Sequence, residues 1–126
     1  MLDEVKMRNR DIKKCYRNIV KKYKKTGKMP SISKLINKTI TSNAPGYYLT
    51  YDYARRLLSS HRRNLLPKTY RKLRRDMIVE IAKKVDRLLL QSPTMTEGEA
   101  LTIVLTNGNA SRFFISNASA CRLINH

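Results

Sequence analysis

Apolar residues recur every three or four positions in several segments of the chain, and polar, mostly basic residues fill the positions between them. This period is typical of amphipathic α-helices. The first stripe contains Ile12, Ile19 and Tyr23, and it predicts a helix over about residues 3–25 that ends at Gly27. The same pattern predicts further helices over about residues 30–41, 51–63, 68–91 and 97–106, and from 117 to the C-terminus. The fold class that we predict is therefore all-α.

Residues that favour helix starts stand before three of these segments. Thr50 and Ser116 are good N-caps, and the spacing of Thr96 and Glu99 matches a capping box. Asn, Gly and Pro mark the turns between helices, and Pro67 breaks the chain before the pattern restarts. These signals set the expected helix boundaries.

Two stretches of the chain carry the same pattern at an offset of 66 residues. Residues 43–50 read N-A-P-G-Y-Y-L-T, and residues 109–116 read N-A-S-R-F-F-I-S. The helix after each stretch repeats as well, A-R-R-L-L from Ala54 and A-C-R-L-I from Ala120. An internal repeat indicates a repeated structural unit. We predict a tandem duplication of a three-helix unit, with residues 1–66 and 67–126 as repeats packed into one compact unit, because each is too small to bury a large core.

The charge of the chain is strongly positive and unequally divided. The 27 Lys and Arg outnumber the 9 Asp and Glu, for a net charge of +18. Residues 1–66 hold 17 of these basic and 4 of these acidic residues, against 10 and 5 in residues 67–126. Such a charge is normally tolerated where a polyanion neutralises it. Nucleic acid is therefore the expected partner, bound mainly by the first repeat, while the second completes the core or offers a surface for a protein partner or a second copy.

A short helix, a turn and a basic second helix form the layout of a helix-turn-helix. The turn of residues 43–49 is longer than the usual turn of about three or four residues. In this interpretation the helix from Tyr51 enters the major groove of double-stranded DNA, and Tyr51, Asp52, Arg55 and Arg56 face base edges. The remaining candidate contacts are nearer to phosphates. They are Ser59, Arg62 and Arg63 on the same helix, Lys34 and Lys38 on the preceding one, and Lys13, Lys14, Arg17, Lys21, Lys24 and Lys25 on the first.

The aromatic pairs Tyr47-Tyr48 and Phe113-Phe114 allow two roles. Core packing under the turn is favoured, because the less basic repeat keeps the pair, and base stacking on RNA stays open as the alternative. A second architecture also stays open, in which residues 47–49 and 113–115 pair as a short two-stranded ribbon ahead of the capped helices. Duplex DNA is favoured over RNA as the partner.

Candidate catalytic and cofactor residues are few. The histidines are His61 and the terminal His126, and no spacing matches a metal motif, a nucleophile elbow or a phosphate-binding glycine loop. Cys15 and Cys121 lie in apolar helical patterns at non-equivalent repeat positions, which predicts buried free thiols. No apolar run approaches the roughly 20 residues of a membrane span. We expect no enzyme activity, no cofactor, no metal and no membrane partner, and a cytoplasmic location.

The repeated aromatic-aromatic-aliphatic-Ser/Thr motif before an Ala/Arg helix, over residues 43–58 and 109–124, resembles a motif in small, mostly uncharacterised basic proteins of gut bacteria and their phages or mobile elements. The resemblance implies a setting, the host cytoplasm or a virion, and not an activity. It supports an alternative function, a structural or assembly protein that binds nucleic acid or an acidic partner without reading its sequence.

Overall fold

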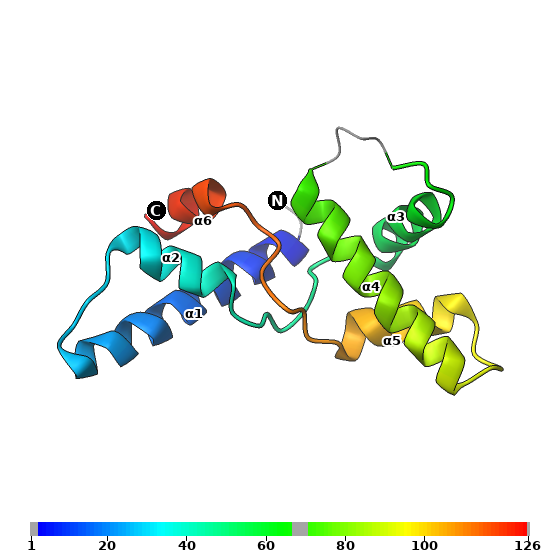
Figure 1. Cartoon of the computed structure of the whole chain (residues 1–126), viewed down its shortest axis with the longest axis horizontal. Coiled ribbons are helices and arrows are strands. Elements are labelled where there is room, and N and C mark those ends of the chain that lie inside the picture. The colour runs from blue at the N-terminus through cyan, green and yellow to red at the C-terminus, as the bar shows by residue number, and fades with distance from the viewer. Residues whose placement is uncertain (1–2, 67–70, 126) are drawn as a thin grey trace. The chain divides into compact units, whose positions relative to one another are not determined.

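The computed structural model describes residues 3–66 and 71–125, and within these ranges the chain forms six α-helices and no β-strand. This confirms the predicted all-α class. Each helix lies within about two residues of its expected range, except that the expected start of the fourth, Lys68, lies outside the described residues. In chain order (Figure 1) the helices are α1 (Asp3–Thr26), α2 (Ile32–Ile40), α3 (Tyr51–Arg62), α4 (Lys72–Gln91), α5 (Glu97–Asn107) and α6 (Asn117–Ile124).

The predicted caps are in place. The Thr50 hydroxyl accepts a hydrogen bond from the backbone N–H of Tyr53 at the start of α3, and Ser116 does the same at α6. Thr96 and Glu99 form a complete capping box at α5. The Ser31 hydroxyl accepts a hydrogen bond from the backbone N–H of Lys34 at the start of α2. Each cap satisfies a backbone donor that a helix start otherwise leaves unpaired, which is why these boundaries could be predicted locally.

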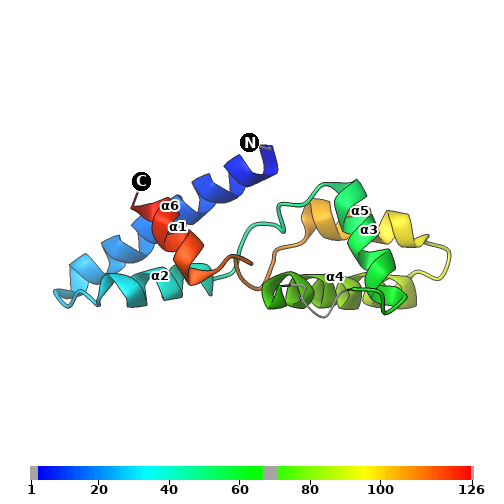
Figure 2. The ribbon, with the colours of Figure 1, turned by 90° about the horizontal axis from the view of Figure 1, so that it is seen from above.

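The helices pack in two compact units that cut across the two halves of the chain. Unit 1 is formed within residues 1–48 and 109–126, and unit 2 within residues 49–108. In unit 1, α1 packs on α2, and α6 packs on both (Figure 1). In unit 2, α4 packs on α5, and α3 packs on both, a grouping that Figure 2 shows from above. Each unit therefore takes two helices from one half of the chain and its third helix from the other half.

This arrangement differs from the expected division into residues 1–66 and 67–126, whose boundary at Pro67 lies outside the described residues. It also separates α2 from α3, which the helix-turn-helix interpretation placed together. The physical reason lies in the connection. Ten residues join α2 to α3, enough to span up to about 33 Å, so α3 is not forced to pack on α2.

The two connecting segments meet inside unit 1. Ala44 and Ala110 exchange backbone hydrogen bonds of 3.0 and 2.9 Å and form an isolated antiparallel bridge. The alternative ribbon between residues 47–49 and 113–115 is not present, because no strand forms there within the described chain. Its pairing is prevented because the Phe113 N–H donates to the carbonyl of Ile40 at the end of α2.

The aromatic residues of these segments pack on one another. The rings of Tyr47 and Phe114 stack with centroids 6.3 Å apart, and those of Tyr48 and Phe113 stack at the same distance. Tyr47 and Phe113 are only 5% and 2% exposed. Core packing, the favoured interpretation, therefore holds for Tyr47 and Phe113, while Tyr48 and Phe114 are half-buried.

Unit 1 and unit 2 each enclose an apolar core. Ile12, Ile36 and Ala120 are almost fully buried in unit 1, as are Ile78 and Leu101 in unit 2. The cysteines are free, as predicted, but both are half-buried and not buried, because each lies at the margin of its helix's apolar stripe. The Cys15 thiol lies 3.9 Å from the Thr39 carbonyl, to which it donates.

Tyr48 is the last residue of the first segment of unit 1, and its hydroxyl contacts α1. The hydroxyl donates a 2.7 Å hydrogen bond to the Asp11 carboxylate, whose side chain is 19% exposed. Burial, reinforced by this hydrogen bond, raises the pKa of the Tyr48 phenol above its usual value. The backbone of Tyr48 is in the left-handed region, with φ of 58°, a conformation that costs a residue with a side chain about 1–2 kcal/mol. The hydrogen bond and the ring stack offset that cost.

We expect Tyr48→Phe to lower the free energy of unfolding by about 1.5–3 kcal/mol near pH 7, because the Asp11 carboxylate loses a hydrogen-bond donor. Since folding raises the pKa of the phenol, the wild-type advantage is complete below about pH 10, the usual pKa of Tyr. It declines as the pH rises further. Urea denaturation of both proteins at pH 7 and pH 10.5 measures this difference. An equal stability of the two proteins at pH 7 would contradict the prediction.

Candidate nucleic-acid interface

The positive charge of the chain is concentrated in unit 1. Its residues 1–48 and 109–126 include 15 Lys and Arg against 3 Asp and Glu, while residues 49–108 of unit 2 include 12 against 6. The net charges are therefore +12 and +6. The charge asymmetry between the two halves of the chain is therefore also present between the two compact units. It persists even though α3, which belongs to the more basic half of the chain, is part of the less basic unit.

A long stretch of the chain, nearly all of it in unit 1, contains no acidic residue. From Ile12 to Tyr51 the chain has ten Lys and Arg and no Asp or Glu. The three carboxylates of unit 1, Asp3, Glu4 and Asp11, all precede this stretch. Glu and Lys pairs one turn apart are the usual way in which a helix neutralises its own surface charge. The C-terminal half of α1 and all of α2 contain no acidic residue that could form such pairs.

Five cations form one exposed face of α1, here called the basic face: Lys14, Arg17, Lys21, Lys24 and Lys25. Their spacing of three or four residues places them on the side of the helix opposite Ile12, which is completely buried. At 1.5 Å per residue, the face extends about 16 Å along the helix axis. Among the described residues none of these five is in an ion pair. Their charge is available to an external anion.

The other predicted contacts of unit 1 lie beside this face or on α2. Lys13 is half-buried at the edge of the α1 core. Lys34 and Lys38 are exposed on α2, one turn apart, and the Lys38 ammonium nitrogen lies 5.0 Å from the centroid of the Tyr23 ring on α1. Lys22 and Lys28 are also exposed and were not among the predicted contacts, although they belong to the same acid-free stretch.

The predicted base-contacting residues are on α3 and therefore in unit 2. Tyr51, Asp52, Arg55 and Arg56 are all exposed in the first two turns, as are Ser59 and Arg63 further along. The Tyr51 hydroxyl lies close to Gly98 at the start of α5. A β-carbon added at Gly98 would be only 2.8 Å from the Tyr51 hydroxyl oxygen. The structure thus exposes these residues but does not bring them together with the basic face in one compact unit.

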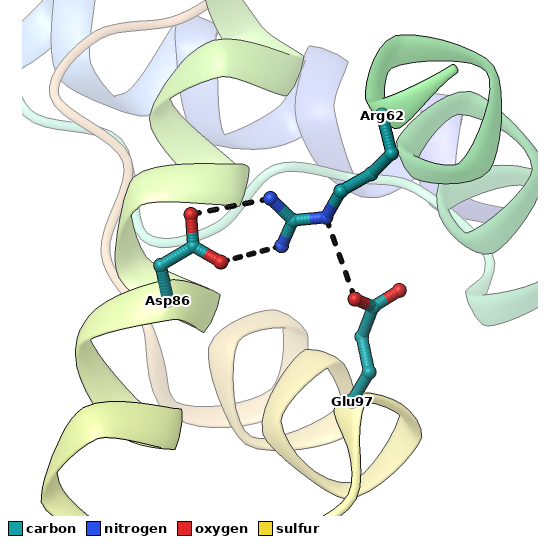
Figure 3. A network of polar contacts seen from close by, with 3 residues as sticks. All are labelled: Arg62, Asp86 and Glu97. Atoms are coloured by element: carbon teal, nitrogen blue, oxygen red, sulfur yellow. Dashed lines mark hydrogen bonds and ion pairs between the residues drawn. The ribbon is translucent and has the colours of Figure 1, made fainter.

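Arg62 has protein partners in place of the phosphate that the sequence suggested. Its guanidinium donates hydrogen bonds of 3.1 and 2.6 Å to the two carboxylate oxygens of Asp86 on α4, and its Nε lies 3.4 Å from Glu97 on α5 (Figure 3). These hydrogen bonds raise the pKa of the Arg62 side chain. A bidentate Arg–carboxylate pair is the strongest form of this contact. Arg62 therefore ties three helices of unit 2 together, a role that sequence alone could not show because its partners are distant along the chain.

Arg74 is engaged in unit 2 in a similar way. Its guanidinium carbon lies 5.3 Å from the centroid of the Tyr53 ring, and it donates a hydrogen bond to the Tyr53 hydroxyl. Lys84 pairs with Glu80 one turn earlier on α4, at 4.0 Å. Unit 2 thus uses part of its positive charge within its own fold, in contrast to the basic face of unit 1.

Two other kinds of site can be checked in the described residues, a metal-binding cluster and a membrane span. Nowhere in residues 3–66 and 71–125 do three His, Cys, Asp or Glu side chains gather as they would around a metal ion. Across the same residues, no helix has the length and apolar character needed to cross a membrane. Comparison with protein-family models, with curated proteins and with solved structures finds no match to this chain.

Proposed function

We propose that this protein binds nucleic acid without catalysing a reaction, and that double-stranded DNA is its main partner. The observation that carries this proposal is the basic face of α1, where five exposed cations stand in a stretch with no acidic residue. Holding such charges close together is unfavourable unless an anion neutralises them. The regular phosphates of a duplex, about one per 1.7 Å of its axis, supply that neutralisation along the length of the face.

Two kinds of contact divide between the two units in this proposal. Lysines of the basic face meet phosphates, which provide affinity without sequence information. Arg55 and Arg56, exposed at the start of α3, contact base edges, because a guanidinium can pair bidentately with guanine. We assign no phosphate contact to Arg62, because its guanidinium already pairs with Asp86 and Glu97.

We also propose that the chain arose by duplication of a three-helix, helix-turn-helix-like unit whose third helix is exchanged between the copies. Ala44 and Ala110, which form the backbone bridge, are 66 positions apart, and so are the buried Ala54 and Ala120. Each compact unit then has the helix count of a helix-turn-helix domain, with the third helix supplied by the other copy. Helix-turn-helix domains use such a helix for recognition.

A second candidate function is favoured by the composition of the basic face. Four of its five cations are lysines, which bind phosphates as point charges and do not supply bidentate recognition. This suits a structural or assembly protein of a phage or mobile element that contacts nucleic acid without sequence readout. Competition separates the two: a regulator prefers its specific duplex over random DNA by about 10³-fold or more, while a packaging protein binds both equally. RNA binding ranks third, because Tyr47 and Phe113 are buried.

The direct test of the proposal is the salt dependence of duplex binding. If roughly six to ten phosphates are contacted, the affinity is expected to fall by about 10³–10⁵ between 50 and 200 mM salt. Fluorescence anisotropy with a labelled random duplex and the full chain measures this slope. Affinity that stays constant across the salt range would remove the proposal.

The triple variant Lys14→Gln, Arg17→Gln and Lys21→Gln locates the contact on the basic face. We expect the slope of log affinity against log salt to become shallower by about 2.7, since each lost phosphate contact removes about 0.9. The matched control changes three exposed cations of α4 instead, Lys72→Gln, Lys83→Gln and Arg87→Gln, with the same loss of charge. An equal change of slope in both triples would show that α1 has no special part in binding.

A further inference from the structure

A pocket of about 410 Å³ lies in unit 1 between the C-terminal half of α1 and the end of α2. Ile19 and Tyr23 of α1 form apolar parts of its wall, and Lys22 of α1 and Lys38 of α2 line it as well. Pockets for small organic ligands typically have about 300–1,000 Å³ and combine apolar walls with a few polar groups. This pocket has both the size and the mixed lining of such a site.

The charges around the pocket favour an anionic ligand. Both charged residues of its lining are lysines, and both belong to the stretch from Ile12 to Tyr51 that has no acidic residue. The nearest carboxylate along α1, that of Asp11, precedes Lys22 by three turns of helix, or about 16 Å. A phosphate placed between Lys22 and Lys38 would therefore meet cations from two helices and no competing carboxylate on this part of α1.

The hydroxyl groups of the pocket favour a ligand that also carries hydrogen-bond donors. The hydroxyls of Thr26, Thr41 and Ser42 donate to the carbonyls of Tyr23, Asn37 and Lys38, at 2.8, 2.7 and 2.6 Å. A hydroxyl whose proton is already used can still accept a hydrogen bond. The lining of the pocket thus combines hydroxyl acceptors, two lysines and apolar side chains.

We propose that this pocket binds one nucleotide unit. Its phosphate lies between Lys22 and Lys38, its sugar hydroxyls or amino groups donate to the threonine and serine oxygens, and its base lies against Ile19 and Tyr23. This chemistry has two sources, a free mononucleotide or one unpaired unit of a bound single strand, and the second rests on the part of the proposed function that the chain binds nucleic acid. In the second case the pocket adds a binding site for one nucleotide to the sequence-independent phosphate contacts of the basic face.

Titration of the ¹⁵N-labelled full chain with adenosine monophosphate, followed by amide chemical shifts, tests the proposal. We expect saturable shifts for residues of the pocket, weaker shifts with adenosine alone, and about a tenfold loss of affinity in Lys38→Gln, as for one lost charge-assisted hydrogen bond. Lys38→Arg keeps the charge and should keep most of the affinity. The control Lys28→Gln removes an exposed lysine of the same unit that does not line the pocket, and thermal unfolding checks that each variant is folded.

Displacement experiments then identify the source. If adenosine monophosphate displaces a single-stranded oligonucleotide, the pocket holds a unit of the strand; if both bind together, it holds a free nucleotide, and either result supports the site. Shifts that never saturate, or equal losses in folded Lys38→Gln and Lys28→Gln, would overturn it. Salt-dependent duplex binding that survives this outcome would leave the proposed function intact, so the two failures can be told apart.

Discussion

Cutting the chain once between α3 and α4 is expected to leave its two halves bound together as one particle of about 14.7 kDa. Unit 1 needs α6 from the second half, and unit 2 needs α3 from the first half. A protease site inserted between Asn64 and Leu65 allows the cut in the folded protein, since both residues are exposed after the end of α3. Light scattering and circular dichroism, before and after cleavage, measure the mass and the helix content.

The two fragments of the cleaved protein should separate only when denaturant unfolds the units. The reason is that neither half of the chain contains all three helices of one unit. The uncut insertion variant is the control, and it should match the wild-type protein in mass and helix content. Two folded fragments that elute separately with full helix content would show that α3 and α6 pack on their own halves. That result would contradict the exchanged arrangement.

Phe113→Ala is expected to lower the stability of unit 1 by about 3–5 kcal/mol, the usual cost of truncating a buried Phe. The ring is 2% exposed, stacks on Tyr48, and belongs to the segment that brings α6 back to α1 and α2. Because whole domains have only about 5–15 kcal/mol of stability, this loss approaches the total for a small unit. Urea denaturation followed by helix content should show an early transition for unit 1.

Phe114→Ala is the matched control for this substitution. Phe114 is the neighbouring residue, has the same side chain and also stacks, on Tyr47, but it is only half-buried. Its truncation leaves a smaller cavity and removes less apolar area from the core, so its cost should be clearly smaller. If the two substitutions destabilise the protein equally, burial at position 113 does not determine the packing of unit 1.

The helices and their starts could be predicted because their determinants are local. Thr50 and Ser116 cap α3 and α6 through backbone groups three residues away, and the capping box of α5 spans the same distance. The apolar stripe of α1, too, is a matter of spacing within a single helix. The exposure of the basic face followed from that stripe, because the side opposite a buried residue faces solvent.

The partners of each helix could not be predicted in the same way. The buried side of α3 contains Ala54, Leu57 and Leu58, and that of α6 contains Ala120, so each is a small apolar surface that could cover either helix pair. Periodicity says which side of a helix is buried but not which helix covers it. The choice depends on the conformations of the connecting segments, such as the left-handed backbone of Tyr48 and the bridge between Ala44 and Ala110.

The candidate site shows the same division. Sequence alone determined that the protein is helical, that its positive charge is concentrated toward the N-terminal part, and that the basic residues of the first helix lie outside its apolar stripe. Only the tertiary structure decided that α3 belongs to a different unit from the basic face, that Arg62 is held by Asp86 and Glu97, and that Lys22 and Lys38 meet at one pocket. The reason is range: caps and helical faces depend on residues within a few positions, while these contacts join residues 16 to 35 positions apart.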